Sequence, residues 1–513
     1  MPTLLDRHID RDGSAIAISG AGGAALTWSR LGERVDRWSD LLAGAGLGEG
    51  DRVAAVLGNR PETFELLLAC LHSGLVLVPV NWHLTAPEIR HILADSGSRA
   101  LVAEPAYAAT AAEARTEGCA LALVLGDRDR DGFAAAEPLL AAADPAGPAR
   151  RTCGSTMLYT SGTTGAPKGV VNNLFTVGAP FERVDRLTRY ARTVLGVPAG
   201  ERVMLDGPWY HSAQLFFSLL SLLQGSRLVL RPRFDPAATL RTIDREQITA
   251  VHLVPTQFVR LLRLDEETRR SFSGASLRRV WHGAGPCPAE VKRAMIDWWG
   301  PVLVEYYGAT EGGAVTLIDS HEWLRRPGSV GRAVPAYELL VVGPDGTPLP
   351  PGREGRVFVR RKGGQGFRYH NDPGKTRKAH LAPDTFTFGE LGRLDEDGYL
   401  YLAGREQDMI VSGGVNVYPA EVEAALLAHP DVRDAAVTGV PDPEFGERVV
   451  AVVEPAAGAG SDLAVRLDRH CRGRLAGFKT PRAYHFVDAL PREPTGKLRK
   501  DALRLTGLPG TPR

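Results

Sequence analysis

Helical and strand-like apolar spacings alternate through the first hundred residues. Trp28 to Leu42 has the spacing of an amphipathic helix, and Gly44 provides a stop signal. Strands are predicted at 53–57, 75–80 and 99–103, and helices at 62–71 and 87–96. This alternation predicts an α/β architecture.

Three further stretches each predict a local structure. The longest apolar region, from Phe64 to Val80, is broken by His72-Ser73-Gly74, so it predicts a helix and then a buried strand, not a membrane span. The segment 134–151 is rich in alanine and proline and is predicted to be a connection. Asp397-Gly398 lies between short apolar runs within 393–402, which predicts a hairpin.

The composition of the chain changes around Arg405 to Gly414, where charged residues are followed by a glycine-rich turn. Glu421-Val422-Glu423 should then open a helix, and strands are predicted at 435–440 and 449–453. The last hundred or so residues can therefore form a compact unit of their own, with a boundary near Gln407.

Composition narrows the function classes. A chain of 513 residues suggests at least two domains. The 61 Lys and Arg residues nearly balance the 60 Asp and Glu residues, so no nucleic-acid partner is indicated. The five cysteines are scattered, without metal-ligand spacing, and the N-terminus lacks the apolar core of a signal peptide, so a reducing cytoplasm is predicted.

The most informative segment runs from Tyr159 to Val170 and combines three glycines, four aliphatic hydroxyls and one lysine. Glycines let a backbone turn tightly and approach a ligand, while amides, hydroxyls and a lysine can bind phosphate oxygens. A flexible surface loop is the plainer alternative. It is not a P-loop of the kinase and GTPase kind, because Pro167 precedes Lys168 and Gly169 follows it.

This segment closely resembles the signature loop of the adenylate-forming superfamily, which contains acyl-CoA synthetases, nonribosomal adenylation domains and firefly-type luciferases. The resemblance extends from about residue 25 to about residue 500. Four later segments match in the expected order: Tyr307-Gly308-Ala309-Thr310-Glu311, Gly404-Arg405, Ser412-Gly413-Gly414 through Glu423, and Pro494-Thr495-Gly496-Lys497.

The resemblance implies an ATP-dependent acid–thiol ligase that uses ATP, Mg²⁺ and coenzyme A. A carboxylate attacks the α-phosphate of ATP, an acyl-adenylate and pyrophosphate form, and the thiol of coenzyme A then displaces AMP. It also implies a large multi-subdomain N-terminal domain over 1–406 and a small, mobile α+β lid domain over 407–513, with the active site between them.

The resemblance also assigns roles at the nucleotide. Glu311 would be the Mg²⁺ ligand, and Thr310 would reach the α-phosphate. Tyr307, followed by Gly308, would stack on adenine. Glu390 would hold the ribose hydroxyls, and Arg405 would hold the ribose hydroxyls or the α-phosphate. The residues that wrap the β- and γ-phosphates would be Thr160, Ser161, Gly162, Thr163, Thr164 and Lys168, and those of the facing adenine wall Gly283, Ala284 and Gly285.

The remaining roles concern the two half-reactions. Lys497 would bridge the substrate carboxylate and the α-phosphate during adenylation and then swing away. His211, after Pro208-Trp209-Tyr210, would gate the passage between the acyl pocket and the thiol tunnel. Gly413 and Gly414 would offer backbone to the pantetheine arm after the lid domain rotates.

Two positions depart from the family pattern. Glu390 stands where an aspartate that binds both ribose hydroxyls is usual, and Gln407 stands at the hinge where aspartate or lysine is usual. These departures keep a half-reaction enzyme, working with a partner ligase, as an alternative. An enzyme that loads a separate carrier protein, a nucleotide-binding regulator without turnover and a homodimer also stay open.

The acid itself is poorly determined by the sequence. No acidic residue stands out among the predicted pocket walls, which disfavours an amino-acid substrate, and several glycines leave room for a bulky aryl, alicyclic or aliphatic acid. The predicted walls are Trp209, Tyr210, Gln214, Val254, Pro255, His282, Gly283, Ala309, Gly312 and Gly313.

Overall fold

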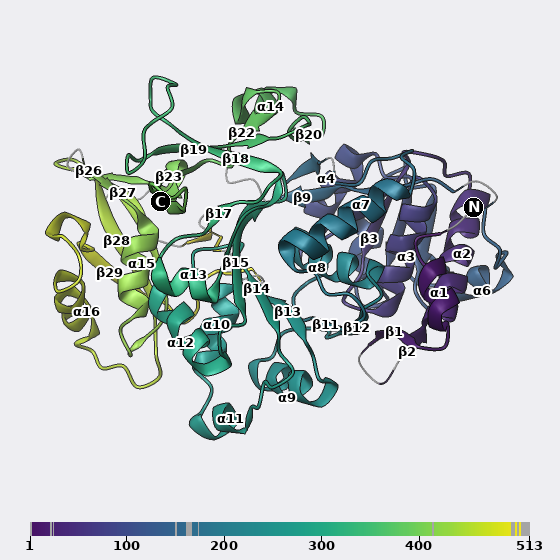
Figure 1. Cartoon of the computed structure of the whole chain (residues 1–513), viewed down its shortest axis with the longest axis horizontal. Coiled ribbons are helices and arrows are strands. Elements are labelled where there is room, and N and C mark those ends of the chain that lie inside the picture. Colours follow the sequence, from purple (N-terminus) through teal and green to yellow (C-terminus); the bar gives the residue numbers. More distant parts are fainter. Residues whose placement is uncertain are drawn as a thin grey trace.

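The computed structural model describes residues 3–20, 23, 25–148, 151–160, 167–172, 174–412, 415–493, 498–499 and 502–503. Over these residues the strands form five sheets. Figure 1 shows the purple N-terminal elements at the right, a teal central sheet, and the yellow-green C-terminal elements at the left. The large N-terminal part and the small C-terminal part both mix helix and strand, which confirms the predicted α/β class.

The first sheet is parallel and has the strand order β7-β6-β5-β3-β4-β8. The elements predicted in the first hundred residues are confirmed to within two residues at each end. The strands are β3 Arg52–Val56, β4 Val76–Pro79, β5 Ala100–Ala103, β6 Leu121–Val124, β7 Ala134–Ala135 and β8 Ser155–Thr156. The helices of this region are α1 Asp6–Asp12, α2 Trp28–Gly44, α3 Pro61–His72, α4 Ala86–Ser96, α5 Ala108–Ala114 and α6 Ala136–Ala142.

Local signals explain why these helices begin and end where they do. Thr27 caps α2 by accepting a hydrogen bond from the backbone N–H of Arg30 at 3.2 Å. Thr85 and Glu88 form a capping box at the start of α4. Gly97 ends that helix in the left-handed region, at φ 60°, which a residue with a Cβ adopts only with strain.

The second sheet has nine strands, and its six central strands are parallel. The carboxyl ends of β11, β13, β14 and β15 therefore meet at one edge, where open α/β sheets bind ligands. Its strands, in spatial order, are β17 Arg332–Ala333, β16 Gly313–Asp319, β15 Leu303–Ala309, β14 Arg279–His282, β13 Ala250–Leu253, β11 Arg202–Leu205, β12 Arg227–Leu230, β1 Ile16–Ser19 and β2 Ala25–Thr27.

The helices between these strands alternate with them along the chain. They are α7 Glu182–Tyr190, the π-helix η2 Ala191–Leu195, α8 Ser212–Leu223, α9 Pro236–Glu246, α10 Pro255–Leu262, α11 Glu266–Ser271, α12 Ala289–Trp299 and α13 Ser320–Arg325.

Two smaller antiparallel sheets complete the N-terminal part. The predicted hairpin at Asp397-Gly398 is confirmed, since Leu394 pairs with Leu400 and Gly398 adopts φ 80°. One sheet contains β9 Leu158–Thr160, β10 Lys168–Val171 and β20 Arg368–Tyr369. The other contains β18 Tyr337–Val342, β19 Gly355–Arg361, β21 His380–Ala382, β22 Thr385–Phe386, β23 Glu390–Leu394 and β24 Leu400–Arg405, with helix α14 Pro373–Ala379 between β20 and β21.

The C-terminal part has its own sheet and its own buried core. The core includes Val422, Val437, Ala451 and Leu467. Its strands are β25 Ile410–Ser412, β26 Val415–Val417, β27 Val432–Asp442, β28 Gly446–Pro455 and β29 Ala483–Phe486. Its helices are α15 Pro419–Leu427, α16 Leu463–Arg472 and the 3-10 turn η4 Gly477–Lys479. A 3-10 turn, η3 Glu406–Asp408, precedes this sheet and contains Gln407, at which the domain boundary stays a prediction.

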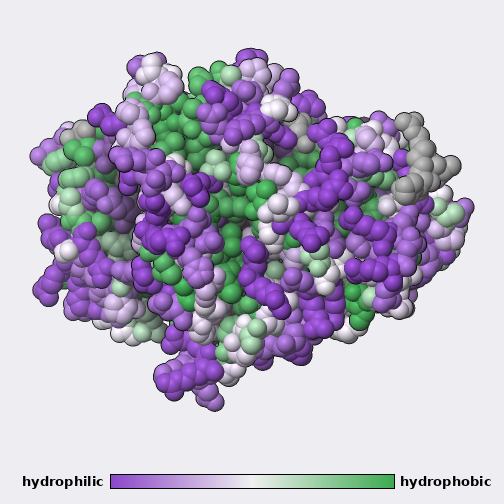
Figure 2. Space-filling model, viewed as in Figure 1, coloured by the Kyte–Doolittle hydropathy of each residue, from purple (hydrophilic) through white to green (hydrophobic). Residues whose placement is uncertain are grey.

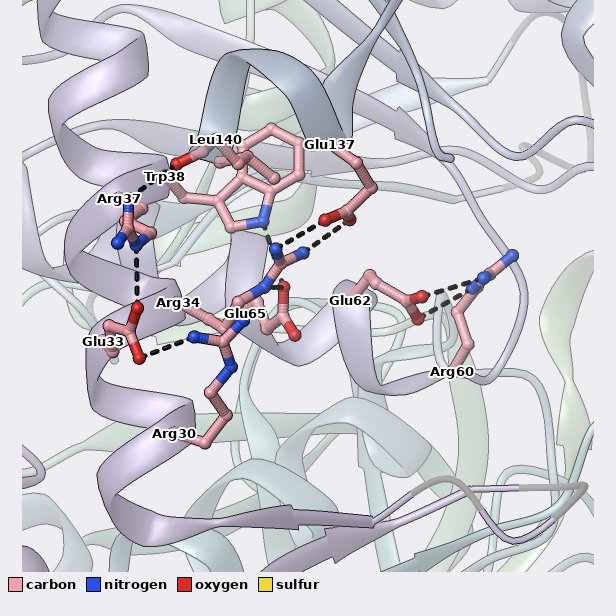
Figure 3. A network of polar contacts seen from close by, with 10 residues as sticks. All are labelled: Arg30, Glu33, Arg34, Arg37, Trp38, Arg60, Glu62, Glu65, Glu137 and Leu140. Carbon is pink, nitrogen blue, oxygen red and sulfur yellow. Dashed lines mark hydrogen bonds and ion pairs between the residues drawn. The ribbon is translucent and has the colours of Figure 1, made fainter. Parts of the chain in front are cut away.

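The prediction of a plain connection over 134–151 is wrong in its first half, where β7 and α6 form. A tertiary contact explains the helix. Arg34 of α2 makes a bidentate pair with Glu137 of α6 at 2.7 Å and also bonds Glu65 of α3 at 2.9 Å. Trp38 donates to the same Glu65 carboxylate at 3.2 Å, and Figure 3 shows this network joining the three helices.

Hydrophilic residues cover most of the face seen in Figure 2, and hydrophobic residues gather along its middle. Within the described residues, none of the helices combines the length and the apolar character needed to cross a membrane.

The Arg34 network generates a stability prediction. Glu65 is only 2% exposed, so Glu65→Leu leaves part of a buried guanidinium unpaired and is expected to cost about 3 kcal/mol of unfolding free energy. Glu33→Leu is the matched control, because Glu33 bonds Arg30 and Arg37 at a half-exposed position and its loss should cost less than about 1 kcal/mol. Urea denaturation measures both, and equal losses would contradict the assignment of Glu65 as the central buried partner.

Candidate active site

The hairpin of β9 and β10 presents the predicted phosphate loop. Thr160 and Lys168 are register partners in this antiparallel pair, so the loop begins and ends at the same point of the sheet. Ser161, Gly162, Thr163 and Thr164 lie outside the described residues. The ammonium of Lys168 lies 5.3 Å from the centre of the Tyr369 ring, and burial followed by the charge of Lys375 lowers the pKa of Lys168.

Tyr369 links this lysine to the predicted metal ligand. Its hydroxyl donates to Glu311 Oε1 at 2.9 Å, and β20 places it there by pairing Tyr369 with Val170 of β10. Burial raises the pKa of Glu311. A divalent cation would stabilise the charged form of this buried carboxylate, so the residues present fit the implied Mg²⁺.

Thr310 is held from two sides beside Glu311. Its hydroxyl donates to Ser212 Oγ at 3.0 Å, at the start of α8, and its carbonyl accepts from the Asn172 side chain at 3.2 Å. Gly308, two residues earlier, has no room for a side chain, because a Cβ would lie 1.9 Å from the Gly313 carbonyl oxygen. The glycine of the Tyr-Gly pair is therefore required by backbone packing.

Glu390 joins Tyr307 to Arg405. The Tyr307 hydroxyl donates to Glu390 Oε2 at 2.9 Å, and Arg405 Nε donates to Glu390 Oε1 at 3.3 Å. Glu390 and Arg405 are register partners in β23 and β24, so the sheet itself brings them together. Burial raises the pKa of Tyr307 and the Glu390 carboxylate raises it further, which keeps the phenol protonated as a donor.

The Gly283-Ala284-Gly285 segment follows the carboxyl end of β14. Gly283 packs closely, since a Cβ there would lie 2.6 Å from the Tyr306 carbonyl oxygen. Ala284 is exposed and adopts φ 63°, a left-handed conformation that is strained for alanine. Such strain is concentrated at functional sites, and a Cβ on Gly285 would meet nothing within 4 Å. The segment therefore offers open backbone on one side.

His211 directly precedes α8, and its ring lies 4.7 Å from the ring of Tyr210. Burial raises the pKa of Tyr210, and the negative charge of Glu493 raises it further. Lys497, Gly413 and Gly414 lie outside the described residues.

Polar contacts join the two parts of the chain elsewhere. Arg263 donates to the Val432 carbonyl at 2.8 Å, and Arg474 pairs with Glu290 at 2.9 Å. These are mostly exposed contacts of small energy, which a domain rotation could break at little cost.

Sequence reasoning missed Tyr369, Ser212 and Asn172, which contact Lys168, Glu311 and Thr310. No local spacing distinguishes Tyr369 from an ordinary strand aromatic, because its role depends on pairing with β10, about two hundred residues earlier. Ser212 was within reach of inference, since it follows His211 directly.

Known proteins resemble the whole chain. The model of the AMP-binding enzyme family matches residues 5–366, and that of the AMP-binding enzyme C-terminal domain matches residues 421–497. A feruloyl-CoA synthase from an Amycolatopsis species is 37% identical over 497 residues, covering 94% of each chain. An indoleacetate–CoA ligase from Aromatoleum aromaticum is 34% identical over 507 residues, covering 98% of this chain and 96% of the relative.

Among solved structures, ATP-bound MatB from Rhodopseudomonas palustris superposes with a TM-score of 0.83 at 32% identity, covering 98% of both chains. Family model, relatives and fold agree along the length of the chain. It belongs to the AMP-binding enzyme family, as an adenylate-forming acid–thiol ligase of the acyl-CoA synthetase kind.

Proposed function

We propose that this enzyme activates a bulky carboxylic acid with ATP and transfers the acyl group to the thiol of coenzyme A. The observation that carries the proposal is the assembly of two clusters on either side of Thr310. Lys168, Tyr369 and Glu311 form one, suited to an anionic phosphate chain, and Tyr307, Glu390 and Arg405 form the other. A nucleotide is divided in the same way, into a polyanionic phosphate chain and a nucleoside with polar rings.

The phosphate end needs cations and positioned donors. We assign Lys168, with the loop from Thr160 through Ser161, Gly162, Thr163 and Thr164, to the β- and γ-phosphates. Glu311 would hold Mg²⁺, which when bound neutralises phosphate charge and orients the α-phosphate for attack. Thr310, whose hydroxyl bonds Ser212, would reach the α-phosphate.

The nucleoside end is assigned to the second cluster. Tyr307 and the Gly283-Ala284-Gly285 segment would enclose adenine, and Gly308 lets the backbone pass behind it. Glu390 and Arg405 would bind the ribose hydroxyls. The Glu390 carboxylate already accepts hydrogen bonds from Tyr307 and Arg405, so the position of its longer side chain is fixed.

The two half-reactions share these groups but differ in the lid domain. In adenylation, Lys497 would lie between the acid and the α-phosphate, and the effect of the Glu493 charge on the pKa of Tyr210 favours this arrangement. For the thiol step, residues 407–513 would turn about Gln407 relative to 1–406. Gly413 and Gly414 would then face the pantetheine arm, with His211 at the entrance of the acyl pocket.

The acid is proposed to be aryl or similarly bulky, because the relatives named above are a feruloyl-CoA synthase and an indoleacetate–CoA ligase. We propose that the reaction takes place in the cytoplasm. Glu390 and Gln407 keep a single half-reaction, completed by a partner ligase, as the alternative; loading of a carrier protein and homodimer formation are the other open arrangements.

A coupled pyrophosphate assay tests the proposal. Pyrophosphate release is measured with a panel of aryl and aliphatic acids, with and without coenzyme A, and thioester products are identified by mass. Acid-dependent pyrophosphate release followed by a CoA thioester is expected. Pyrophosphate release without any thioester would favour the half-reaction alternative, and no acid-dependent release would contradict the function.

Glu390→Gln tests the ribose cluster. The amide keeps the shape of the side chain but loses the charge that binds Arg405, so KM for ATP is expected to rise about 10-fold with a smaller effect on kcat. Steady-state kinetics with saturating acid measures this, and an unchanged KM for ATP would remove Glu390 from the nucleotide site. Glu338→Gln, which breaks an exposed pair with Arg360, is the control.

Lys497→Ala is expected to reduce acyl-adenylate formation by about 10²–10³ while sparing thiolysis of supplied acyl-AMP, because charge develops beside this cation only in the first step. Rapid-quench measurement of the two half-reactions separates the effects. Equal losses in both steps would show that the lysine acts in binding or structure instead.

Gln407→Pro is expected to let one half-reaction survive while the other collapses. Proline fixes φ near about −65°, so a hinge residue could no longer absorb a large backbone rotation. The two half-reactions and the melting temperature are measured together. Normal rates for both steps would locate the pivot elsewhere, and a joint fall with lost thermal stability would mean that the fold was damaged.

A further inference from the structure

A buried polar chain crosses the carboxyl edge of the central sheet beside the proposed nucleotide site. Gln214, in the first turn of α8, bonds His252 of β13 at 2.9 Å, and His252 bonds the hydroxyl of Tyr306 of β15 at 2.9 Å. Gln214 is 4% exposed, His252 3% and Tyr306 6%. None of the three is needed for nucleotide chemistry.

Each end of this chain lies near residues assigned to the active site. Gln214 lies two residues after Ser212, which bonds Thr310. At the other end, Tyr306 packs against Gly283, where a Cβ would lie 2.8 Å from its ring. Gln214 and Tyr210 are also among the residues that the sequence predicts as walls of the acyl pocket.

The hydrogen bonds fix the orientation of the Gln214 amide. The same side-chain atom of Gln214 faces both His252 Nδ1, at 2.9 Å, and the His252 carbonyl oxygen, at 3.3 Å. A carbonyl oxygen can only accept, so the Gln214 atom must be the NH₂ group. His252 Nδ1 is then an acceptor, and Nε2–H donates to the Tyr306 hydroxyl. The imidazole is neutral, as expected where burial lowers the pKa of His252 to about 3.

This orientation leaves Gln214 Oε1 turned away from His252. It is fully buried and has no hydrogen-bond partner among the described residues. The side chain cannot swing freely, because it fills the space over Gly207, where a Cβ would lie 2.2 Å from Gln214 Nε2. The Tyr210 hydroxyl is a second buried group with no described partner. Buried polar atoms are almost always hydrogen-bonded. Two buried polar groups without a described partner, both among the predicted walls of the acyl pocket, therefore point to a ligand.

The surroundings restrict what that ligand can be. Phe217 stacks on Trp281 at 4.6 Å and on His252 at 5.5 Å, which closes the inner side of the chain with flat apolar rings. With His252 neutral and Gln214 uncharged, nothing in this chain compensates a charged group. A neutral hydrogen-bond donor suits a lone amide oxygen, whereas an apolar group would leave it unmet.

We propose that the enzyme selects carboxylic acids that carry a hydroxyl remote from the carboxylate, and that this hydroxyl donates to Gln214 Oε1. The inference rests on the proposed function, since it concerns the acid that the ligase activates. Gln214 is then a specificity residue, held by His252 and Tyr306, and Tyr210 is the neighbouring hydroxyl partner.

The test compares matched acids that differ only in the remote hydroxyl: 4-hydroxycinnamic with cinnamic acid, 4-hydroxyphenylacetic with phenylacetic acid, and 8-hydroxyoctanoic with octanoic acid. The ratio of kcat/KM within each pair is measured for the unmodified enzyme, for Gln214→Leu and for the control Ser221→Ala. Ser221 is buried on the same helix, and its hydroxyl donates to the Phe217 carbonyl one turn earlier at 2.6 Å.

In at least one pair the unmodified enzyme is expected to prefer the hydroxylated acid by about 10- to 100-fold, as for a buried acceptor left unmet by the other acid. Gln214→Leu should bring this ratio near one without changing KM for ATP, and Ser221→Ala should keep it. Both acids of a pair are measured with the same enzyme sample. A partly misfolded fraction therefore lowers both kcat/KM values by the same factor and leaves their ratio unchanged.

Two results would overturn the inference while leaving the proposed function intact: equal kcat/KM for both members of every pair, or a preference that survives Gln214→Leu. If no acid of the panel or of the wider pyrophosphate screen produced a thioester or pyrophosphate, the proposed function itself would fail, and the inference with it.

Discussion

The carboxylate of Glu390 is the contact on which the arrangement of the site depends. It binds Tyr307, from the strand that is directly followed by Thr310 and Glu311, and Arg405, the last residue before the turn that contains Gln407. One buried side chain therefore connects the catalytic edge of the central sheet to the segment that leads into the C-terminal part. A shorter aspartate would have to reach the same two partners by a shift of β23, so the glutamate is matched to the spacing found here.

At the proposed phosphate end, one side chain likewise connects two others. Lys168 and Glu311 are brought together by Tyr369, whose strand pairs with β10. Lysine and phenol are partly desolvated, which would strengthen their interaction with a bound polyanion relative to water, whereas the carboxylate would meet that polyanion through a cation. Chemistry that needs no covalent enzyme intermediate requires this kind of preset electrostatic frame, and the frame here comes from three segments far apart in the sequence.

Much of this was predictable from the sequence. The alternating spacings predicted α2, α3, α4, β3, β4 and β5, because periodicity follows directly from burial on one face or two. Helix α6 was missed because its alanine and proline content was interpreted as a connection, although alanine favours helix, and because its anchoring pair with Arg34 is not visible locally. The motifs identified Lys168, Tyr307 and Glu311. The place of Tyr369 depends on strand pairing, and the Gln214–His252–Tyr306 chain depends on packing of a helix against the sheet, neither of which a local pattern encodes.

The most direct test of the central claim follows the oxygen atoms of the acid. An acid that the enzyme accepts as a substrate is labelled with ¹⁸O in its carboxylate and supplied together with ATP and coenzyme A. The AMP produced is then analysed by mass spectrometry. An attack of the carboxylate on the α-phosphate predicts one ¹⁸O atom in each AMP. Unlabelled AMP, or label found in inorganic phosphate with ADP as the product, would contradict acyl-adenylate formation.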